Sequence, residues 1–485
     1  MKLFASICLL LAASIGFATG TRAADTNDVH GWLTNTFRPW LTRSYPEIYT
    51  SFYPEWLHDH PIGLQPDPFT NWLSDVFPDL DTEMFPTWLE NPSLDRLGTN
   101  IPAWWGAAMK GKYSVSPAAK PIATIIRGPY LQLGTTNLIR TGGDSNTFFV
   151  THPVIGTRQP TRVWVLGDPG TRKKAERDVR DAYYKWTGDR RTDFWLMLGD
   201  NAYTAGKDTE YQGAIFDVFG AMLRKSVLWP CLGNHDAGSA NSPIQFGVYY
   251  DIFTLPAQAQ AGGVMSGSEA YYSFNYANIH VVCLDSSDSD WSTNGLMLRW
   301  LKTDLEANTQ DWLVAYCHHP PYTKGSHNSD QDRDSEARMR MVREHLLPLL
   351  EEHGLDLMLN GHSHAYERSF LLDGFYGRST NLNAQAHFKS VNDGRKDGSG
   401  IYVKPSRGPA AHEGAIYVVA GSSGQKSGGK LDHPVSACSL NVLGSLVLDF
   451  DGPRLDATFI DDKAVVRDSF TIMKGGETTA VENTR

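Results

Sequence analysis

Apolar runs of four to six residues recur along the chain from residue 162 onward and alternate with stretches of helical periodicity. The stretch 171–186, for example, places Ala175, Val179 and Tyr183 on one face of a helix. Buried strands that alternate with helices are typical of α/β proteins, so this pattern predicts an α/β body. The predicted strands of this body are 163–166, 194–198, 227–232, 279–284, 312–316 and 355–359.

The last part of the chain follows a different pattern. Four apolar segments there are separated by Gly, Pro and Asp turns, which is typical of antiparallel strands. These segments are 415–420, 444–450, 454–460 and 464–472. Before the α/β body, residues 118–160 form a connector with short strand-like pieces.

A tryptophan repeat precedes the connector. Trp40, Trp56, Trp72, Trp88 and Trp104 follow one another at a constant spacing of 16 residues, and four of them are followed by Leu. A fixed period of this kind indicates an internal repeat. One interpretation is a row of short helical turns that bury their Trp-Leu pairs. The other is a row of exposed aromatic side chains that dock on a cell envelope, a polysaccharide or a partner protein.

The first residues have the order of a secretory signal. Lys2 is followed by the apolar stretch 3–17 and then by small residues that end near Ala24. This apolar stretch is shorter than the roughly 18–20 residues needed to span a bilayer. We therefore predict a signal peptide over 1–24 and a secreted protein, extracellular or periplasmic, with an uncleaved anchor as the alternative.

Composition narrows the class of protein. At 485 residues the chain exceeds the size of one ordinary core, so more than one domain is expected. The net charge of −10 and the absence of a long basic run argue against a dedicated nucleic-acid partner. The four cysteines beyond the predicted signal lack the regular spacing of a disulfide scaffold, so we expect no essential disulfide; they are Cys231, Cys283, Cys317 and Cys438.

Five short polar blocks stand directly after predicted strands. Loops that follow strand ends meet at one rim of an α/β sheet, where sites form. Each block supplies Asp, Asn, Tyr or His, and a Gly precedes four of the five and permits sharp turns. The blocks are Gly167-Asp168-Pro169-Gly170, Gly199-Asp200-Asn201-Ala202-Tyr203, Gly233-Asn234-His235-Asp236, His318-His319-Pro320-Pro321-Tyr322 and Gly361-His362-Ser363-His364-Ala365-Tyr366-Glu367-Arg368.

Together these blocks have the residue types of a two-metal site. Two ions about 3.5–4 Å apart need a bridging carboxylate and a set of nitrogen and oxygen ligands to complete both coordination shells. His, Asn and carboxylate ligands suit Fe, Zn or Mn, whereas the cysteines stand on the strand side of the loops and do not look like ligands.

The order GDxG, GDxxY, GNH[DE], HxP and GHxHxYER resembles that of the purple acid phosphatases, within the metallophosphoesterase superfamily. Many other members of the superfamily have Asp-x-His in the first block, whereas this chain has no His there and has Tyr203 three residues after Asp200. The resemblance covers about 162–472. It implies a sandwich of two mixed β-sheets flanked by helices, in a catalytic domain over 161–474. The other parts are then a repeat segment over 25–117, a remnant β region over 118–160 and a tail over 475–485.

The resemblance also implies a role for each ligand. Fe(III) would be held by Asp168, Tyr203 and His364, a divalent Fe, Zn or Mn by Asn234, His318 and His362, and Asp200 would bridge the two ions. Pro320 sets the His-x-Pro register, so that His318 is the ligand and His319 lines the substrate site. His235 and His327 match the two histidines of the family that face the substrate.

The implied reaction is hydrolysis of phosphomonoesters by a hydroxide held on the metal pair. His235 and Asn201 would donate to phosphate oxygens. Protonated His235 or His327 would give the leaving alkoxide its proton, which favours an acidic to neutral optimum because imidazole has a pKa of about 6.5. Glu367 and Arg368 are expected to form a structural ion pair behind the site.

One feature departs from the family pattern. Segments 127–134 and 143–149 resemble the opening and closing strands of a β-sandwich, but only a few residues separate them, so a hairpin or an extended cover is expected.

Two alternatives to the phosphomonoesterase remain. A phosphodiesterase or nucleotide pyrophosphatase could use the same metal centre. An envelope-binding protein with a vestigial catalytic body is the other alternative, against which the complete ligand set argues.

Overall fold

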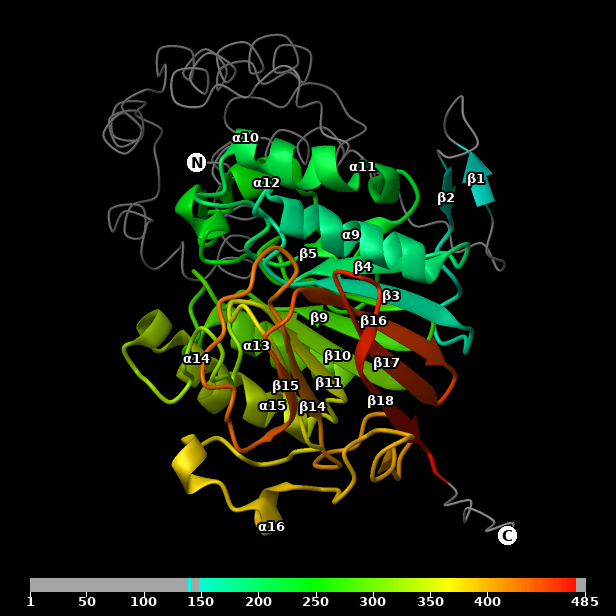
Figure 1. Cartoon of the computed structure of the whole chain (residues 1–485), viewed down its shortest axis with the longest axis vertical. Helices are drawn as coiled ribbons and strands as arrows, with labels where there is room; N and C mark the ends of the chain where they lie inside the picture. Colours follow the sequence, from blue (N-terminus) through cyan, green and yellow to red (C-terminus); the bar gives the residue numbers. More distant parts are fainter. Residues whose placement is uncertain (1–137, 141–147, 477–485) are drawn as a thin grey trace, which may run out of the picture. The chain divides into compact units, whose positions relative to one another are not determined.

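The computed structural model describes residues 138–140 and 148–476 (Figure 1). The chain divides into two compact units, 1–118 and 119–485, and the described residues belong to the second. The predicted signal, the tryptophan repeat and residues 477–485 lie outside the described residues, so those predictions stay open.

One seven-stranded sheet combines a parallel half with an antiparallel half. Its order is β13-β18-β17-β16-β3-β4-β5, in which β3, β4 and β5 are parallel and β16, β17 and β18 form an antiparallel meander. The bounds are β3 (Thr161–Leu166), β4 (Phe194–Met197), β5 (Val227–Pro230), β13 (Tyr402–Lys404), β16 (Gly444–Asp451), β17 (Arg454–Asp461) and β18 (Val466–Lys474).

The second seven-stranded sheet has four parallel strands at its centre and antiparallel strands at its edges. Its order is β15-β12-β14-β11-β10-β9-β8. The bounds are β8 (Tyr272–Tyr276), β9 (Ile279–Cys283), β10 (Trp312–Cys317), β11 (Leu357–Asn360), β12 (Tyr366–Ser369), β14 (Ile416–Ala420) and β15 (Ser436–Leu440). All residues of β9, β10, β11 and β14 are buried, as expected for strands covered on both faces.

Helices cover the outer faces of both sheets. In Figure 1, α9 to α12 lie beyond the sheet that holds β3–β5, and α13 to α15 lie beside the sheet that holds β9–β11. The first group is α9 (Lys174–Thr187), α10 (Asp208–Tyr211), α11 (Asp217–Leu223) and α12 (Val248–Ile252). The second is α13 (Leu296–Ala307), α14 (Arg338–Met341) and α15 (Leu347–Glu352), with α16 (Ala384–His387) further along the chain. Tyr183 of α9 stacks on Trp164 of β3 with ring centroids 4.1 Å apart, which seats the predicted apolar helix face on the sheet.

Aromatic side chains join the two sheets face to face. Trp229 of β5 stacks on Phe274 of β8 at 4.2 Å, and Trp312 of β10 meets Phe450 of β16 edge-on at 5.4 Å. The Trp312 indole also donates to the carbonyl of Gly452, so its one polar atom is satisfied in the core. This packing holds the two sheets in register and thereby sets where their loops meet.

The prediction of two mixed β-sheets flanked by helices is confirmed. One strand differs from expectation: 415–420 was expected to be antiparallel, but β14 pairs parallel to β11 and antiparallel to β12. The parallel pairing with β11 requires a crossover connection, and the chain between the end of β11 and the start of β14 is long enough to supply one.

Two short antiparallel pairs complete the described structure. β1 (Leu138–Arg140) pairs with β2 (Phe148–Val150) within the segment 118–160, and β6 (Ala240–Asn241) pairs with β7 (Phe246–Gly247). Within 138–140 and 148–476, none of the helices has the length and apolar character needed to cross a bilayer.

Candidate metal centre

The five polar blocks meet where the ends of the parallel strands of both sheets come together. Two glycines show how close the loops lie. A Cβ on Gly199, which has a φ of 86°, would stand 2.5 Å from Nδ1 of His318, and a Cβ on Gly233 would stand 2.1 Å from the backbone nitrogen of Asp200. Only glycine fits at these positions, because any side chain would separate the loops that carry the ligands.

Asp168, Tyr203 and His364 form one contact group. The Tyr203 hydroxyl donates to Asp168 Oδ1 over 3.2 Å and lies 3.2 Å from His364 Nε2. The same Nε2 is 3.5 Å from Asp168 Oδ1. These are the three residues assigned by resemblance to Fe(III).

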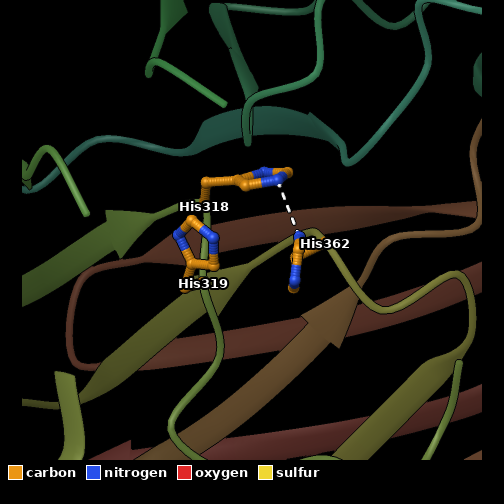
Figure 2. A group of neighbouring side chains, drawn as sticks. All are labelled: His318, His319 and His362. Carbon is orange, nitrogen blue, oxygen red and sulfur yellow. Dashed lines mark hydrogen bonds between the residues drawn. The ribbon is translucent and has the colours of Figure 1, made fainter. Parts of the chain in front are cut away.

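Asn234, His318 and His362 form a second group. Asn234 Oδ1 is 2.9 Å from His318 Nε2 and 3.0 Å from His362 Nδ1, and the two imidazole nitrogens are 3.1 Å apart. Figure 2 shows the nitrogen contact between the nearly perpendicular rings of His318 and His362, with His319 beside them. These three residues are the ones assigned to the divalent ion.

Asp200 lies between the two groups, because its carboxylate, the carboxylate of Asp168 and a ring nitrogen of His318 lie within 4.8 Å of one another. Its Oδ1 is 3.5 Å from His318 Nε2 and accepts a hydrogen bond from the backbone nitrogen of His235 at 2.9 Å. Asp168 links the groups from the other side, because its Oδ2 accepts from the backbone nitrogen of His362 at 2.7 Å. The structure thus brings all seven predicted ligands together.

Outer hydrogen bonds orient the imidazoles. His318 Nδ1 donates to the carbonyl of Leu198 at 2.8 Å, which leaves the lone pair of Nε2 facing Asn234. His364 Nδ1 lies 3.0 Å from Ser427 Oγ, and its backbone nitrogen donates to Ser326 Oγ. Second-layer partners of this kind are typical of metal-binding histidines, because they hold the ring and its tautomer.

The chemistry of these atoms fits a cation. Asn234 Oδ1 lies at hydrogen-bond distance from His318 Nε2, and because His318 Nδ1 donates to Leu198, both atoms can direct lone pairs at a shared cation. Burial lowers the pKa of His318, but Asp200 and Asp168 outweigh it and the net pKa is raised. Asp168 and Asp200 are buried, and in the described part of the chain histidines are their only ion-pair partners. Buried carboxylates without Lys or Arg partners need another positive charge.

The phenol of Tyr203 points to the same conclusion. Burial, followed by the charges of Asp168 and Asp200, raises its pKa well above the usual value. A phenolate could therefore form there only against a strong cation, such as the trivalent ion that the resemblance implies.

His235 and His327 lie at the exposed side of the centre. The side chain of His235 is 36% exposed; its Nδ1 bonds to the carbonyl of Thr204 at 2.6 Å, and its Nε2 is 4.0 Å from Asp200 Oδ2. The side chain of His327 is 30% exposed, and its ring stacks on His362 with centroids 3.9 Å apart. Both histidines can therefore reach a group bound at the centre.

Asn201 and His319, expected to contact substrate, are buried behind the ligands. Asn201 Nδ2 donates to the carbonyl of Cys231 at 2.8 Å and to Asp236 Oδ2 at 2.9 Å. His319 Nδ1 is 2.8 Å from Ser286 Oγ. These bonded nitrogens face the protein, whereas His319 Nε2 is buried without a hydrogen-bond partner among the described residues, and a ring nitrogen of His319 lies within 4.8 Å of ring nitrogens of His318 and His362.

Two further residues differ from their expected roles. Asp236 stands in the third block, and the motifs predict no role for it. Its carboxylate accepts hydrogen bonds from Gly233 N, Asn201 N and Tyr211 Oη and so joins the second and third loops. The expected pairing of Glu367 with Arg368 is wrong. Arg368 pairs with Asp468 at 2.6 Å, while Glu367 accepts from Lys324 N at 3.0 Å, because neighbouring residues of β12 point to opposite faces of the strand.

The part of the chain that holds this centre is a calcineurin-like metallophosphoesterase domain. Residues 161–366 match the family model described as calcineurin-like phosphoesterase, and that span contains all seven predicted ligands. Within this class the chain is distantly homologous to plant purple acid phosphatases over about half its length.

Three similar proteins illustrate the relationship. Probable purple acid phosphatase 20 of Arabidopsis thaliana is 28% identical over 51% of this chain and 55% of the relative. Probable inactive purple acid phosphatase 9 of the same plant is 26% identical over 47% of this chain and 37% of the relative. The structure of purple acid phosphatase PPD1 from yellow lupin (Lupinus luteus) matches with a TM-score of 0.51 at 18% identity, over 68% of this chain and 56% of that one, which shows the shared fold. This chain thus spans about half the length, or less, of these curated relatives.

Proposed function

We propose that this chain is a metal-dependent acid phosphatase that hydrolyses phosphomonoesters. The observation that supports it most directly is the separation of the ligands into two contact groups, Asp168–Tyr203–His364 and Asn234–His318–His362, with Asp200 between them. One carboxylate between two ligand sets is the arrangement that a pair of metal ions requires.

The two groups differ in the ion they suit. Asp168, Tyr203 and His364 would hold Fe(III), because a phenolate oxygen is a ligand for a hard trivalent ion. Asn234, His318 and His362 would hold a divalent Fe, Zn or Mn, with Asp200 shared. When bound, the ions neutralise phosphate charge and activate water as a nucleophile.

His235 and His327 carry the proton chemistry of the chain itself. Because His235 Nδ1 bonds to Thr204, its Nε2 is the atom that can donate to a phosphate oxygen. His327 Nδ1 donates to Asp334 at 2.7 Å, so its Nε2 can give a proton to the leaving oxygen. An imidazole whose Nδ1 already donates can donate through Nε2 only when the ring is protonated, so we expect turnover to fall as the pH rises.

We also propose that the protein is exported. Lys2 and the apolar stretch 3–17 support this proposal, because they have the order of a secretory signal. Localisation of a tagged full-length chain in its host would test it, and retention in the cytosol would contradict it.

The function is tested with purified full-length protein. We expect two metal ions per chain, iron among them, and faster hydrolysis of an aryl phosphate monoester than of a bis-aryl phosphodiester at pH 5–6. A higher rate on the diester would replace the monoesterase proposal with a phosphodiesterase. Hydrolysis of neither ester, or binding of fewer than two ions, would overturn the proposed function.

A further inference from the structure

Asp334 and Ser335 lie outside the five polar blocks and contact two histidines of the site. Ser335 Oγ lies 2.5 Å from His362 Nε2, the nitrogen of that ring that faces away from Asn234. Ser335 Oγ also donates to Asp334 Oδ1 at 2.9 Å, and the same oxygen accepts from His327 Nδ1 at 2.7 Å. Adjacent residues therefore touch a predicted ligand and the predicted proton donor.

The donors and acceptors of this network run in one consistent direction. A carboxylate can only accept hydrogen bonds, so both Ser335 and His327 donate hydrogen bonds to Asp334. The Ser335 oxygen then accepts from His362 Nε2, and the lone pair of His362 Nδ1 is directed toward Asn234 and His318. The remaining nitrogen of His327, Nε2, is free of this network. His362 is thus fixed in the tautomer that metal binding through Nδ1 requires, and His327 keeps Nε2 for the proton that it can donate once the ring is protonated.

The backbone at Ser335 is strained. Ser335, Glu336 and Ala337 have φ values of 52°, 54° and 64°, the left-handed region that residues other than glycine rarely occupy. Three such residues in succession persist only where surrounding contacts hold them, and backbone strain of this kind clusters at functional sites. Arg338, the next residue in the chain, makes one such contact, because it donates a hydrogen bond to the carbonyl of Ser287 at 3.1 Å.

Asp334 is well suited to anchor the network. Burial raises the pKa of its carboxyl, but hydrogen bonds from Asn328 N and from His327 outweigh burial, and the net pKa is lowered. The carboxylate thus accepts hydrogen bonds from two protein groups, which favour its ionised form.

We propose that Asp334 and Ser335 are positioning residues that connect the two halves of the reaction. Ser335 orients His362 for the divalent ion, and Asp334 orients His327 as the proton donor. This inference rests on the proposed function, but one of its tests requires no turnover.

Zinc binding tests the role of Ser335. Zn(II) is titrated into metal-free full-length wild-type protein and Ser335→Gly. Glycine removes the hydroxyl and also relieves the strained φ, so the variant should be at least as stable as the wild type. We expect about 10-fold weaker binding of one zinc equivalent, the lower end for loss of a second-layer partner. Ala337→Gly is the matched control, because it relieves the same strain without removing a contact, and should bind zinc as the wild type does.

Equal zinc affinity in Ser335→Gly and Ala337→Gly would overturn the role of Ser335. Failure of the wild type itself to bind any zinc would instead overturn the divalent site of the proposed function, so the two failures are distinguishable.

Kinetics test the role of Asp334. We expect Asp334→Asn to lower kcat by about 10-fold with KM changed less than two-fold, because the donor is misoriented while substrate binding remains. In a His327→Ala background the same substitution should change kcat by less than two-fold, since residues that act through one another are not additive. Asp332→Asn, which removes an exposed charge in the same segment, should behave as the wild type. An equal loss of kcat in both backgrounds would overturn the positioning role.

Discussion

The hydroxyl of Tyr203 lies 3.2 Å from Asp168 Oδ1, although the two residues follow different strands of the sheet. Asp168 has a φ of 54°, which turns the chain sharply after β3 and points its carboxylate at the loop after β4. The phenol is therefore buried against a carboxylate, in surroundings that oppose its ionisation. A metal ion at this point would replace the phenol proton, so that both oxygens could act as ligands.

Substitution of Tyr203 tests the iron assignment. Iron-loaded wild-type protein should have a visible charge-transfer band from the phenolate, and Tyr203→Phe should lose it because the phenol oxygen is gone. Tyr184→Phe is the control, since Tyr184 lies on α9 away from the centre. A visible spectrum and metal analysis of the three proteins provide the check. An unchanged band in Tyr203→Phe would rule out this tyrosine as the ligand.

Substitution of Asp200 tests the bridging role. Asp200→Ala should bind at most one metal ion tightly and lose activity by at least about 100-fold, because the shared carboxylate stabilises both ions. Asp189→Ala, in an exposed loop, should retain both ions and full activity. Near-normal turnover with two bound ions in Asp200→Ala would be incompatible with a bridge.

Removal of the metals should lower the thermal stability. Ions that bind the folded chain stabilise it by about 2.7 kcal/mol at a hundredfold excess over Kd. This corresponds to a Tm lower by about 5 °C after chelation, restored when metal is added back. Calorimetry with and without a chelator measures the shift. An equal Tm with and without the chelator would mean that no ion bound at the centre stabilises the folded chain.

Glu176 should make the stability fall between about pH 4.5 and pH 8. Burial raises the pKa of this side chain to about 8 in the folded chain, against an ordinary value of 4.5. The folded state then holds a proton that the unfolded state has lost, so stability decreases as pH rises through this window and is constant below it.

The measurement is denaturant unfolding of Glu176→Gln at pH 5 and pH 8. The amide cannot ionise, so the free energy of unfolding of the variant should exceed that of the wild type by roughly 4 kcal/mol at pH 8, at about 1.4 kcal/mol per pKa unit, and by less than about 1 kcal/mol at pH 5. Asp181→Asn, at an exposed position of the same helix, should follow the wild type. Parallel pH profiles for Glu176→Gln and the wild type would show that Glu176 is not protonated in the folded protein.

Much of the fold and of the centre was predictable from local patterns. The apolar runs at β3, β4, β10 and β11 are buried strands whose ends carry polar blocks. An apolar run such as 163–166 or 312–316 can be recognised from its own residues, without knowledge of its partners in the fold. The ligand assignments needed the resemblance as well, because Asp, Asn and His after a strand are individually common. The direction of β14 was not predictable, since an apolar run has the same pattern in parallel and antiparallel pairing.

The amino-acid sequence by itself determined the class of fold, the strands that would be buried and the residue types at their ends, because these follow from hydrophobic periodicity and from motifs a few residues long. Only the tertiary structure decided that Arg368 would pair with Asp468, that Asn201 and His319 would face the protein, and that Asp334 and Ser335 would reach His327 and His362. The physical reason is that these contacts join segments far apart in the chain or depend on a strained turn, and neither leaves a periodic signal in the sequence.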